Sequence, residues 1–151
     1  MLFSKPVEYS LRALSYLATM ENGSVAMARD IAEETDIPPF FLAKILQDLA
    51  RQGLLISLKG PTGGFRLKDP PEKVTLLRVV EAIHKEPFAA RCPAGHSPCG
   101  RGNACGFYES WQPVQDHVVE YLKGTTLAHA GRALDRKRQN TAKARKRSGK
   151  S

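Results

Sequence analysis

Two amphipathic stretches separated by the sequence Asp-Ile-Pro-Pro place the strongest constraint on how this chain can fold. The first, residues 27–35, repeats apolar residues at helical spacing. The residue before a proline is pushed out of the helical region, so this helix must stop before Pro38. Pro39 suits the first turn of a second helix, residues 40–53, whose end is marked by Gly53. The pattern predicts two short helices joined by a tight turn, a helix-turn-helix.

A small β-hairpin is predicted directly after this helix pair. Residues 54–60 and 65–69 have the composition of short strands around a glycine-containing turn. A helix-turn-helix followed by a hairpin is the order of a winged helix, whose second helix enters the major groove of DNA while the hairpin tip reaches the backbone or the minor groove. A plain hairpin turn is the alternative.

The winged-helix interpretation assigns candidate DNA contacts to three places. The start of the second helix would face the bases, the glycine-rich tip would approach the groove, and two arginines would contact phosphates unless they are only solvated surface charges. The candidates are Arg29, Phe40, Lys44, Lys59, Gly60, Pro61, Thr62 and Arg66.

Further helices are predicted around this unit, which makes the fold class mainly α with a small β-hairpin wing. Apolar residues at helical spacing indicate helices over 6–20, 75–85 and 107–123. The last carries aromatic residues on its apolar face, so it is either a dimerisation helix or packed within its own chain. We therefore expect a winged helix-turn-helix domain at 1–85, a loop at 86–106, a dimerisation helix region at 107–131 and a tail at 132–151.

The net charge of +8 is confined to the tail. Residues 1–131 carry 14 basic and 14 acidic side chains, whereas residues 132–151 carry 9 and 1. A tail with almost no large apolar residues cannot bury a core, so we expect it to be disordered, and either to strengthen DNA binding through phosphates or only to solubilise. No apolar run is long enough to span a bilayer and no signal peptide precedes the domain, so we expect a cytoplasmic protein without a membrane partner.

All three cysteines lie in the Gly- and Pro-rich loop, with six and then five residues between them. Structural zinc sites pair their ligands two to four residues apart, and no such pair exists here. Cys92, Cys99 and Cys105 fit better around an iron–sulfur cluster, with zinc and a thiol redox switch as alternatives. A fourth ligand could be His96, a carboxylate from elsewhere or a small molecule.

The stretches IPPFFLAKILQDLARQGLL and KGPTGGFRL, followed by three spaced cysteines and a long helix, resemble the IscR/NsrR family of bacterial winged-helix transcription regulators over about residues 1 to 130. The resemblance implies a homodimer that binds double-stranded operator DNA. It also implies a [4Fe-4S] or [2Fe-2S] cluster near the dimer interface, whose state switches DNA affinity.

The resemblance further implies a fourth ligand. IscR-like members carry a His three residues after the last cysteine, where this chain has Tyr108. The nitric-oxide- and redox-sensing members use an acid of the first helix, donated by the other protomer, and the matching residue is Glu8. Glu8 is otherwise explained by the helix dipole. The spacing between the first two cysteines is one residue longer than is common among the nitric-oxide sensors.

These observations predict a DNA-binding regulator, acting as a repressor, that responds to nitric oxide, redox state or iron and has no catalytic activity. A zinc- or thiol-responsive winged-helix regulator is the first alternative. A small iron–sulfur redox or cluster-transfer protein is the second, although the sequence has no CxxC, phosphate loop or nucleophile–base pair.

Overall fold

The computed structural model of the chain describes residues 3–95, 102 and 105–148. In chain order its elements are α1 (Lys5–Leu17), α2 (Ala28–Thr35), α3 (Pro39–Arg51), β1 (Leu55–Leu58), β2 (Gly64–Leu67), the 3-10 helix η1 (Pro71–Lys73), α4 (Leu76–His84), the 3-10 helix η2 (Phe88–Ala90), α5 (Tyr108–Gly124) and α6 (Leu127–Ser148). The predicted fold class, mainly α with a hairpin wing, is confirmed.

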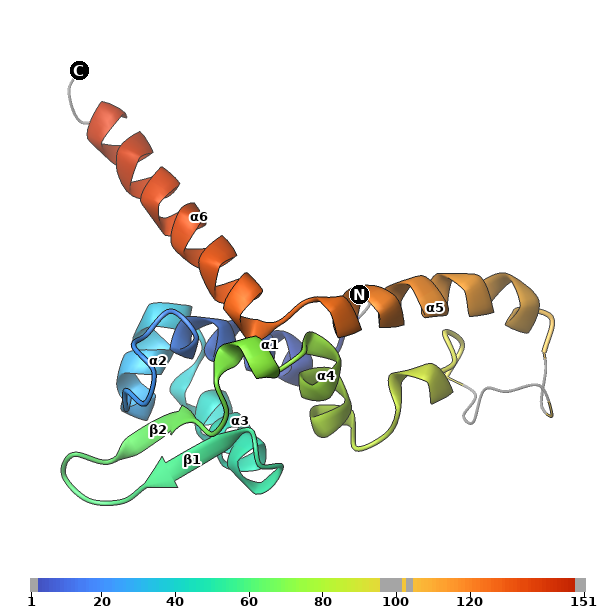
Figure 1. The fold of residues 1–151 in the computed structure, drawn as a ribbon, viewed down its shortest axis with the longest axis horizontal. Helices are drawn as coiled ribbons and strands as arrows, with labels where there is room; N and C mark the ends of the chain where they lie inside the picture. The colour runs from blue at the N-terminus through green and yellow to red at the C-terminus, as the bar shows by residue number, and fades with distance from the viewer. Residues whose placement is uncertain (1–2, 96–101, 103–104, 149–151) are drawn as a thin grey trace.

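The core forms where α1 is enclosed by its neighbours. This helix contacts α2, α3, α4 and α6 (Figure 1). Its apolar residues recur at helical spacing, so Val7, Leu14 and Leu17 point to one side and are buried. The core therefore ties the helix-turn-helix, the C-terminal helix and α4 into one unit.

The turn between α2 and α3 follows the predicted break. Asp36 ends α2 in the left-handed conformation with φ 52°, and the N–H of Ile37 donates to the carbonyl of Ala32 at 3.2 Å. Ile37 is then buried, and Pro39 starts α3 at a position where its missing N–H costs nothing.

The wing is an antiparallel hairpin in which Leu55 pairs with Leu67 and Leu58 with Gly64. Its strands are shorter than predicted because the tip takes up residues 59–63. Ala26, just before α2, exchanges two backbone hydrogen bonds of 2.8 and 2.9 Å with Phe65. The hairpin is thus fixed to the helix-turn-helix by its second strand.

The C-terminal region differs from the prediction. Residues 132–148 are not disordered but continue α6, which begins at Leu127. Ala, Arg, Lys and Gln are strong helix formers, and the first turns of α6 are anchored on the body. Gly131 is buried against Ala18, and Arg138 pairs with Glu34 at 3.0 Å. A composition that cannot bury a core does not prevent a segment from extending a helix that is already docked.

The helix at 107–123 is confirmed as α5, with Pro113 inside it. Figure 1 shows α5 extending away from the wing, and α4 is the helix that it contacts most. None of the helices among the described residues has the length and apolar content needed to cross a membrane.

Candidate DNA interface and cysteine loop

The exposed face of α3 carries two of the predicted DNA contacts. The helix buries Leu42, Ile45, Leu46 and Leu49 on one side, so residues of its other side turn outward. Phe40 is 66% exposed, and the Nζ atom of Lys44 lies 4.3 Å from the centroid of its ring. A cation over the face of an aromatic ring is attracted by the ring's negative face, which restricts its position. This face presents a positioned cation and an apolar ring to any surface that α3 meets.

The wing tip is shaped by its backbone. Lys59, Gly60, Pro61 and Thr62 are all exposed, and the N–H of Gly63 donates to the carbonyl of Gly60 at 3.0 Å. Gly60 has φ 99°, a conformation that side chains disfavour. The tip is therefore narrow, with little side-chain bulk around its exposed backbone.

The two predicted phosphate contacts differ in environment. Arg29 is exposed on α2, with only an exposed, loose pair of 3.5 Å to Asp30. Arg66 lies half-buried in β2, opposite Ile56. Both stand on elements that Figure 1 shows grouped with α3 and the wing, at the opposite end from α5. The structure thus places all the predicted DNA contacts on one winged-helix unit.

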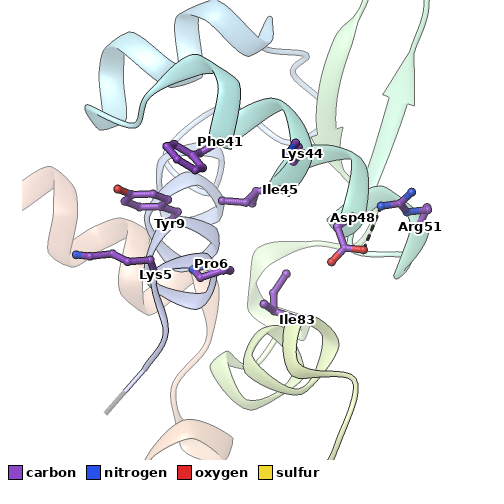
Figure 2. A pocket seen from close by; sticks show the side chains of 9 residues that line it. All are labelled: Lys5, Pro6, Tyr9, Phe41, Lys44, Ile45, Asp48, Arg51 and Ile83. Atoms are coloured by element: carbon purple, nitrogen blue, oxygen red, sulfur yellow. Dashed lines mark hydrogen bonds and ion pairs between the residues drawn. The ribbon is translucent and has the colours of Figure 1, made fainter. Parts of the chain in front are cut away.

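An apolar hollow of about 520 Å³ lies where α1, α3 and α4 meet (Figure 2). Asp48 in its wall pairs with Arg51 at 3.4 Å and Lys85 at 3.7 Å. The first turn of α1 and the middle of α3 therefore meet across partly open space rather than a filled core. The lining residues are Lys5, Pro6, Tyr9, Phe41, Lys44, Ile45, Asp48, Arg51 and Ile83.

Glu8 lies on the same first turn of α1. Its carboxylate accepts a hydrogen bond of 2.8 Å from the exposed Nζ of Lys5. That bond and the carboxylate charge raise the pKa of Lys5 above its usual value. Because an exposed lysine is the partner, the carboxylate is held only weakly within its own chain.

The cysteine loop is described only in part. Cys92 is half-buried and Cys105 is exposed, and both are free thiols. Cys99 and the alternative ligand His96 lie outside the described residues. Within the described ranges, no three His, Cys, Asp or Glu side chains come together as a metal site. The ligand set of Cys92, Cys99, Cys105 and Glu8 therefore stays a prediction.

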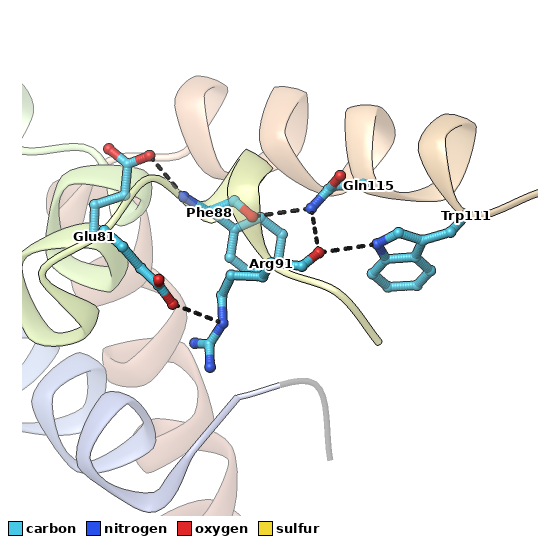
Figure 3. Close-up of polar contacts among 6 residues, drawn as sticks. Glu81, Phe88, Arg91, Trp111 and Gln115 are labelled. Atoms are coloured by element: carbon cyan, nitrogen blue, oxygen red, sulfur yellow. Dashed lines mark hydrogen bonds and ion pairs between the residues drawn. The ribbon is translucent and has the colours of Figure 1, made fainter. Parts of the chain in front are cut away.

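The segment that leads into Cys92 is fastened to α5 (Figure 3). Gln115, which is 1% exposed, donates from Nε2 to the carbonyls of Phe88 and Arg91, both at 3.0 Å. The indole N–H of Trp111 also donates to the Arg91 carbonyl, at 3.3 Å. The N–H of Phe88 donates to the Glu81 carboxylate of α4 at 3.0 Å. We call Trp111, Gln115 and their two acceptor carbonyls the α5 clamp.

Sequence reasoning missed the α5 clamp. It placed Trp111 on an apolar face and gave no role to Gln115. A signal was present, because Gln115 lies seven residues before the buried Leu122 and so shares its side of the helix. A glutamine at such a position needs polar partners, which its own helix does not supply.

His84 is partly buried at the end of α4. Its Nε2 atom is inaccessible and has no hydrogen-bond partner among the described residues. Burial lowers the pKa of His84, the positive charge of Arg91 lowers it further, and Glu86 acts in the opposite direction.

Comparison with known proteins identifies the family. The Rrf2 profile, described as that of an iron-dependent transcriptional regulator, matches residues 3–132. The chain belongs to the Rrf2 family. An HTH-type transcriptional regulator of Aquifex aeolicus is 33% identical to this chain over 129 residues. The match covers 84% of this chain and 89% of that protein. This family membership confirms the resemblance seen in the sequence.

One further relative and one solved structure are also similar to this chain. The transcriptional regulator IscR of Pectobacterium carotovorum is 29% identical, over 71% of this chain and 64% of its own. The structure of CymR, the global cysteine regulator of B. subtilis, superposes with a TM-score of 0.72 at 21% identity, over 87% of this chain and 96% of that one. The likeness to CymR concerns the fold.

The chain is thus a DNA-binding transcriptional regulator of the Rrf2 family, and not an enzyme.

Proposed function

We propose that the protein is a homodimeric repressor whose affinity for operator DNA is switched by an iron–sulfur cluster. Cys92, Cys99 and Cys105 of one protomer and Glu8 of the partner subunit would hold the cluster. The observation that carries the proposal is the arrangement around α5. Two free thiols flank the segment that leads into this helix, and one face of the helix is apolar and exposed.

The described residues fit a cluster. Thiolates are the soft donors that iron–sulfur clusters require, and both described cysteines are at least partly accessible. A carboxylate is a harder and more weakly held ligand for iron. To bind the cluster, Glu8 would lose only its ion pair with the exposed Lys5. When bound, the cluster would join the cysteine loop of one protomer to α1 of the other, and nitric oxide, oxygen or loss of iron would break this connection.

A second copy of the chain is the partner that suits α5. Phe107, Val114 and Tyr121 are 64%, 49% and 64% exposed, and they recur every seven residues. Trp111 and Val118, which lie between them in sequence, are half-buried: Trp111 binds the Arg91 carbonyl and Val118 packs against the core of its own chain. The three exposed residues therefore form one line along the helix. Exposed apolar residues in such a register favour a helix of the same kind, crossing this one.

The switch in DNA affinity would depend on how the cysteine loop, α5 and α1 are connected. The cysteine loop enters and leaves beside α5, while Glu8 lies on α1 next to the hollow that α1 shares with α3. A site that joins one protomer's loop to the other's α1 would set the angle between the two winged helices. Only one angle matches two half-sites on DNA, so the arrangement of the loop controls affinity.

The proposal is tested by anaerobic purification, visible and EPR spectra, and measurement of DNA affinity with and without the cluster. The DNA is a duplex that the purified protein selects from a random pool. We expect a brown protein and a difference of at least about tenfold in affinity at equal salt. Equal affinities of the two forms would exclude the switch.

The fourth ligand has its own test. Replacement Glu8→Ala should leave the fold intact but change the cluster spectrum and speed its loss to a chelator. Lys5→Ala is the control, since it removes only the exposed partner of Glu8. A Glu8→Ala protein with the wild-type spectrum and stability would remove Glu8 from the site.

A thiol-responsive regulator is the second candidate. It is favoured by the exposed Cys105 and by the likeness to CymR, which is described as a cysteine regulator. A colourless protein whose DNA affinity changes with thiol oxidation would support it. A colourless protein that contains zinc would support the metal alternative instead.

A further inference from the structure

We propose that Gln115 and Trp111 are positioning residues for Cys92, through which α5 controls the geometry of the cysteine site. The inference deepens the proposed function and rests on it where the cluster is concerned. The reactivity of the Cys92 thiol tests it independently of any cluster.

The α5 clamp acts on the backbone immediately before the cysteine. Arg91 is the neighbour of Cys92, and its carbonyl accepts two hydrogen bonds from α5, one from Gln115 and one from Trp111. The Phe88 carbonyl accepts the second N–H of Gln115. With three bonds from one helix over four residues, the chain enters the loop along a fixed path (Figure 3).

Burial makes this clamp stronger than a surface contact. Gln115 is buried, and hydrogen bonds shielded from water do not exchange with solvent. Both acceptors are carbonyls, so the amide nitrogen rather than the oxygen must face them, and the orientation of the side chain is determined.

The amide oxygen of Gln115 shows that packing alone does not account for a glutamine at this position. The Oε1 atom of Gln115 is buried with no hydrogen-bond partner among the described residues. An apolar side chain of similar size would avoid that penalty. The glutamine therefore costs stability through its unpaired Oε1 atom, while its Nε2 atom donates the two hydrogen bonds that hold the entrance of the loop.

The α5 clamp also joins two other parts of the molecule. Phe88 is bonded to both helices: its N–H donates to the Glu81 carboxylate of α4, and its carbonyl accepts from Gln115 of α5. Val114, in the exposed seam of α5, lies about 100° around the helix from Gln115, since it is the preceding residue. A change in how α5 meets a second protomer would therefore reach Cys92 through the α5 clamp.

The first test measures thiol alkylation in the reduced protein without metal. Gln115→Leu keeps side-chain volume and removes both donors, so we expect Cys92 to react about three- to tenfold faster with iodoacetamide, relative to Cys105 in the same molecule. Gln112→Leu is the matched control. Gln112 is on the same helix but bonds only to Asp116 on the surface. Equal Cys92 to Cys105 ratios in the two variants would overturn the proposal.

A second variant guards against a change in the whole fold. Trp111→Phe keeps a six-membered aromatic ring but removes the indole N–H together with the smaller ring. The variant loses one hydrogen bond of the clamp, so a smaller increase in Cys92 reactivity is expected, relative to Cys105 in the same molecule. Wild-type reactivity in this variant would remove Trp111 from the clamp.

The third arm uses protein loaded with iron and sulfide. Gln115→Leu should change the visible and EPR spectra and lose iron to a chelator several times faster than Gln112→Leu. If the wild type itself forms no cluster, the proposed function fails, whereas the alkylation result still decides the role of Gln115. A wild-type spectrum and iron-loss rate in Gln115→Leu would overturn the positioning role.

Discussion

Gly64 is the residue on which the position of the wing depends most directly. Its φ is 151°, and an added Cβ would lie 2.3 Å from the carbonyl oxygen of Ala26. That carbonyl belongs to the bridge that fixes β2 to the helix-turn-helix. No other residue type avoids the contact without breaking the bridge.

Replacement Gly64→Ala should therefore destabilise the protein by roughly 2 kcal/mol, because backbone atoms must move apart. Urea unfolding followed by circular dichroism measures this free energy. Gly124→Ala is the control, since nothing lies within 4 Å of the Cβ it would add. Equal unfolding midpoints for the two variants would show that the wing tolerates the shift.

His84 should give the stability of the protein a pH dependence. Burial lowers its pKa in the folded state below the ordinary value of 6.5, so the unfolded chain binds a proton more readily. The free energy of unfolding should therefore fall as the pH drops below about 6.5, and level off once folded His84 is protonated too. Urea unfolding at a series of pH values measures this.

The contribution of His84 is isolated by substitution. In His84→Gln the part of the slope below pH 6.5 should disappear, whereas His129→Gln, at an exposed position of α6, should keep it. A wild-type slope in His84→Gln would mean that other groups carry the dependence.

The helix-turn-helix and the wing are the parts of the fold that the sequence predicts best. Apolar spacing, the Asp-Ile-Pro-Pro break and the paired glycines are local signals, and local geometry decides both the helix-turn-helix and the hairpin. The candidate DNA contacts could be predicted because outward positions follow once the buried stripe of α3 is known.

The α5 clamp and the course of α6 could not be predicted in the same way. Gln115 binds acceptors at the start of η2 and just after it, more than twenty residues earlier, and Arg138 binds Glu34, over a hundred residues away. Such contacts depend on how elements pack, which a single sequence does not show. For the same reason, only the resemblance to a known family, and not the spacing of residues, predicts Glu8 as a ligand.

Replacement Lys44→Ala tests the assignment of α3 as the DNA-reading helix. The lysine is exposed and positioned over Phe40, so its loss should weaken specific binding about tenfold. Fluorescence anisotropy with the selected duplex, at several salt concentrations, measures this. Lys123→Ala, an exposed lysine of α5, should bind as the wild type does. Equal affinity for all three proteins would contradict the assignment.

Truncation after Asn140 tests the basic end of α6. It removes five basic residues and no acidic one, and it keeps the Arg138–Glu34 pair that anchors the helix. We expect an unchanged unfolding midpoint, weaker binding to unselected DNA and a shallower dependence on salt, because phosphate contacts are lost. An unchanged salt dependence would mean that the segment serves solubility alone.

The behaviour of the whole molecule depends on whether two chains meet along α5. Within one chain, α5 buries little besides Gln115 and Leu122, while Phe107, Val114 and Tyr121 stay exposed. An exposed apolar seam on a helix that extends from the body is unfavourable in water unless a partner covers it. The winged helices also need a fixed separation to read two half-sites, and α5 is the element placed to provide it.

The double replacement Val114→Asp with Tyr121→Asp should therefore convert the protein to a monomer. Two carboxylates would be buried without partners at the seam, which should raise the dimer dissociation constant at least about a hundredfold. Sedimentation velocity over a range of concentrations measures it. Lys123→Asp places the same charge on the opposite side of α5 and should leave the dimer intact. A double variant that remains dimeric would move the interface to another surface, and the coupling between α5 and Cys92 would then act within one chain only.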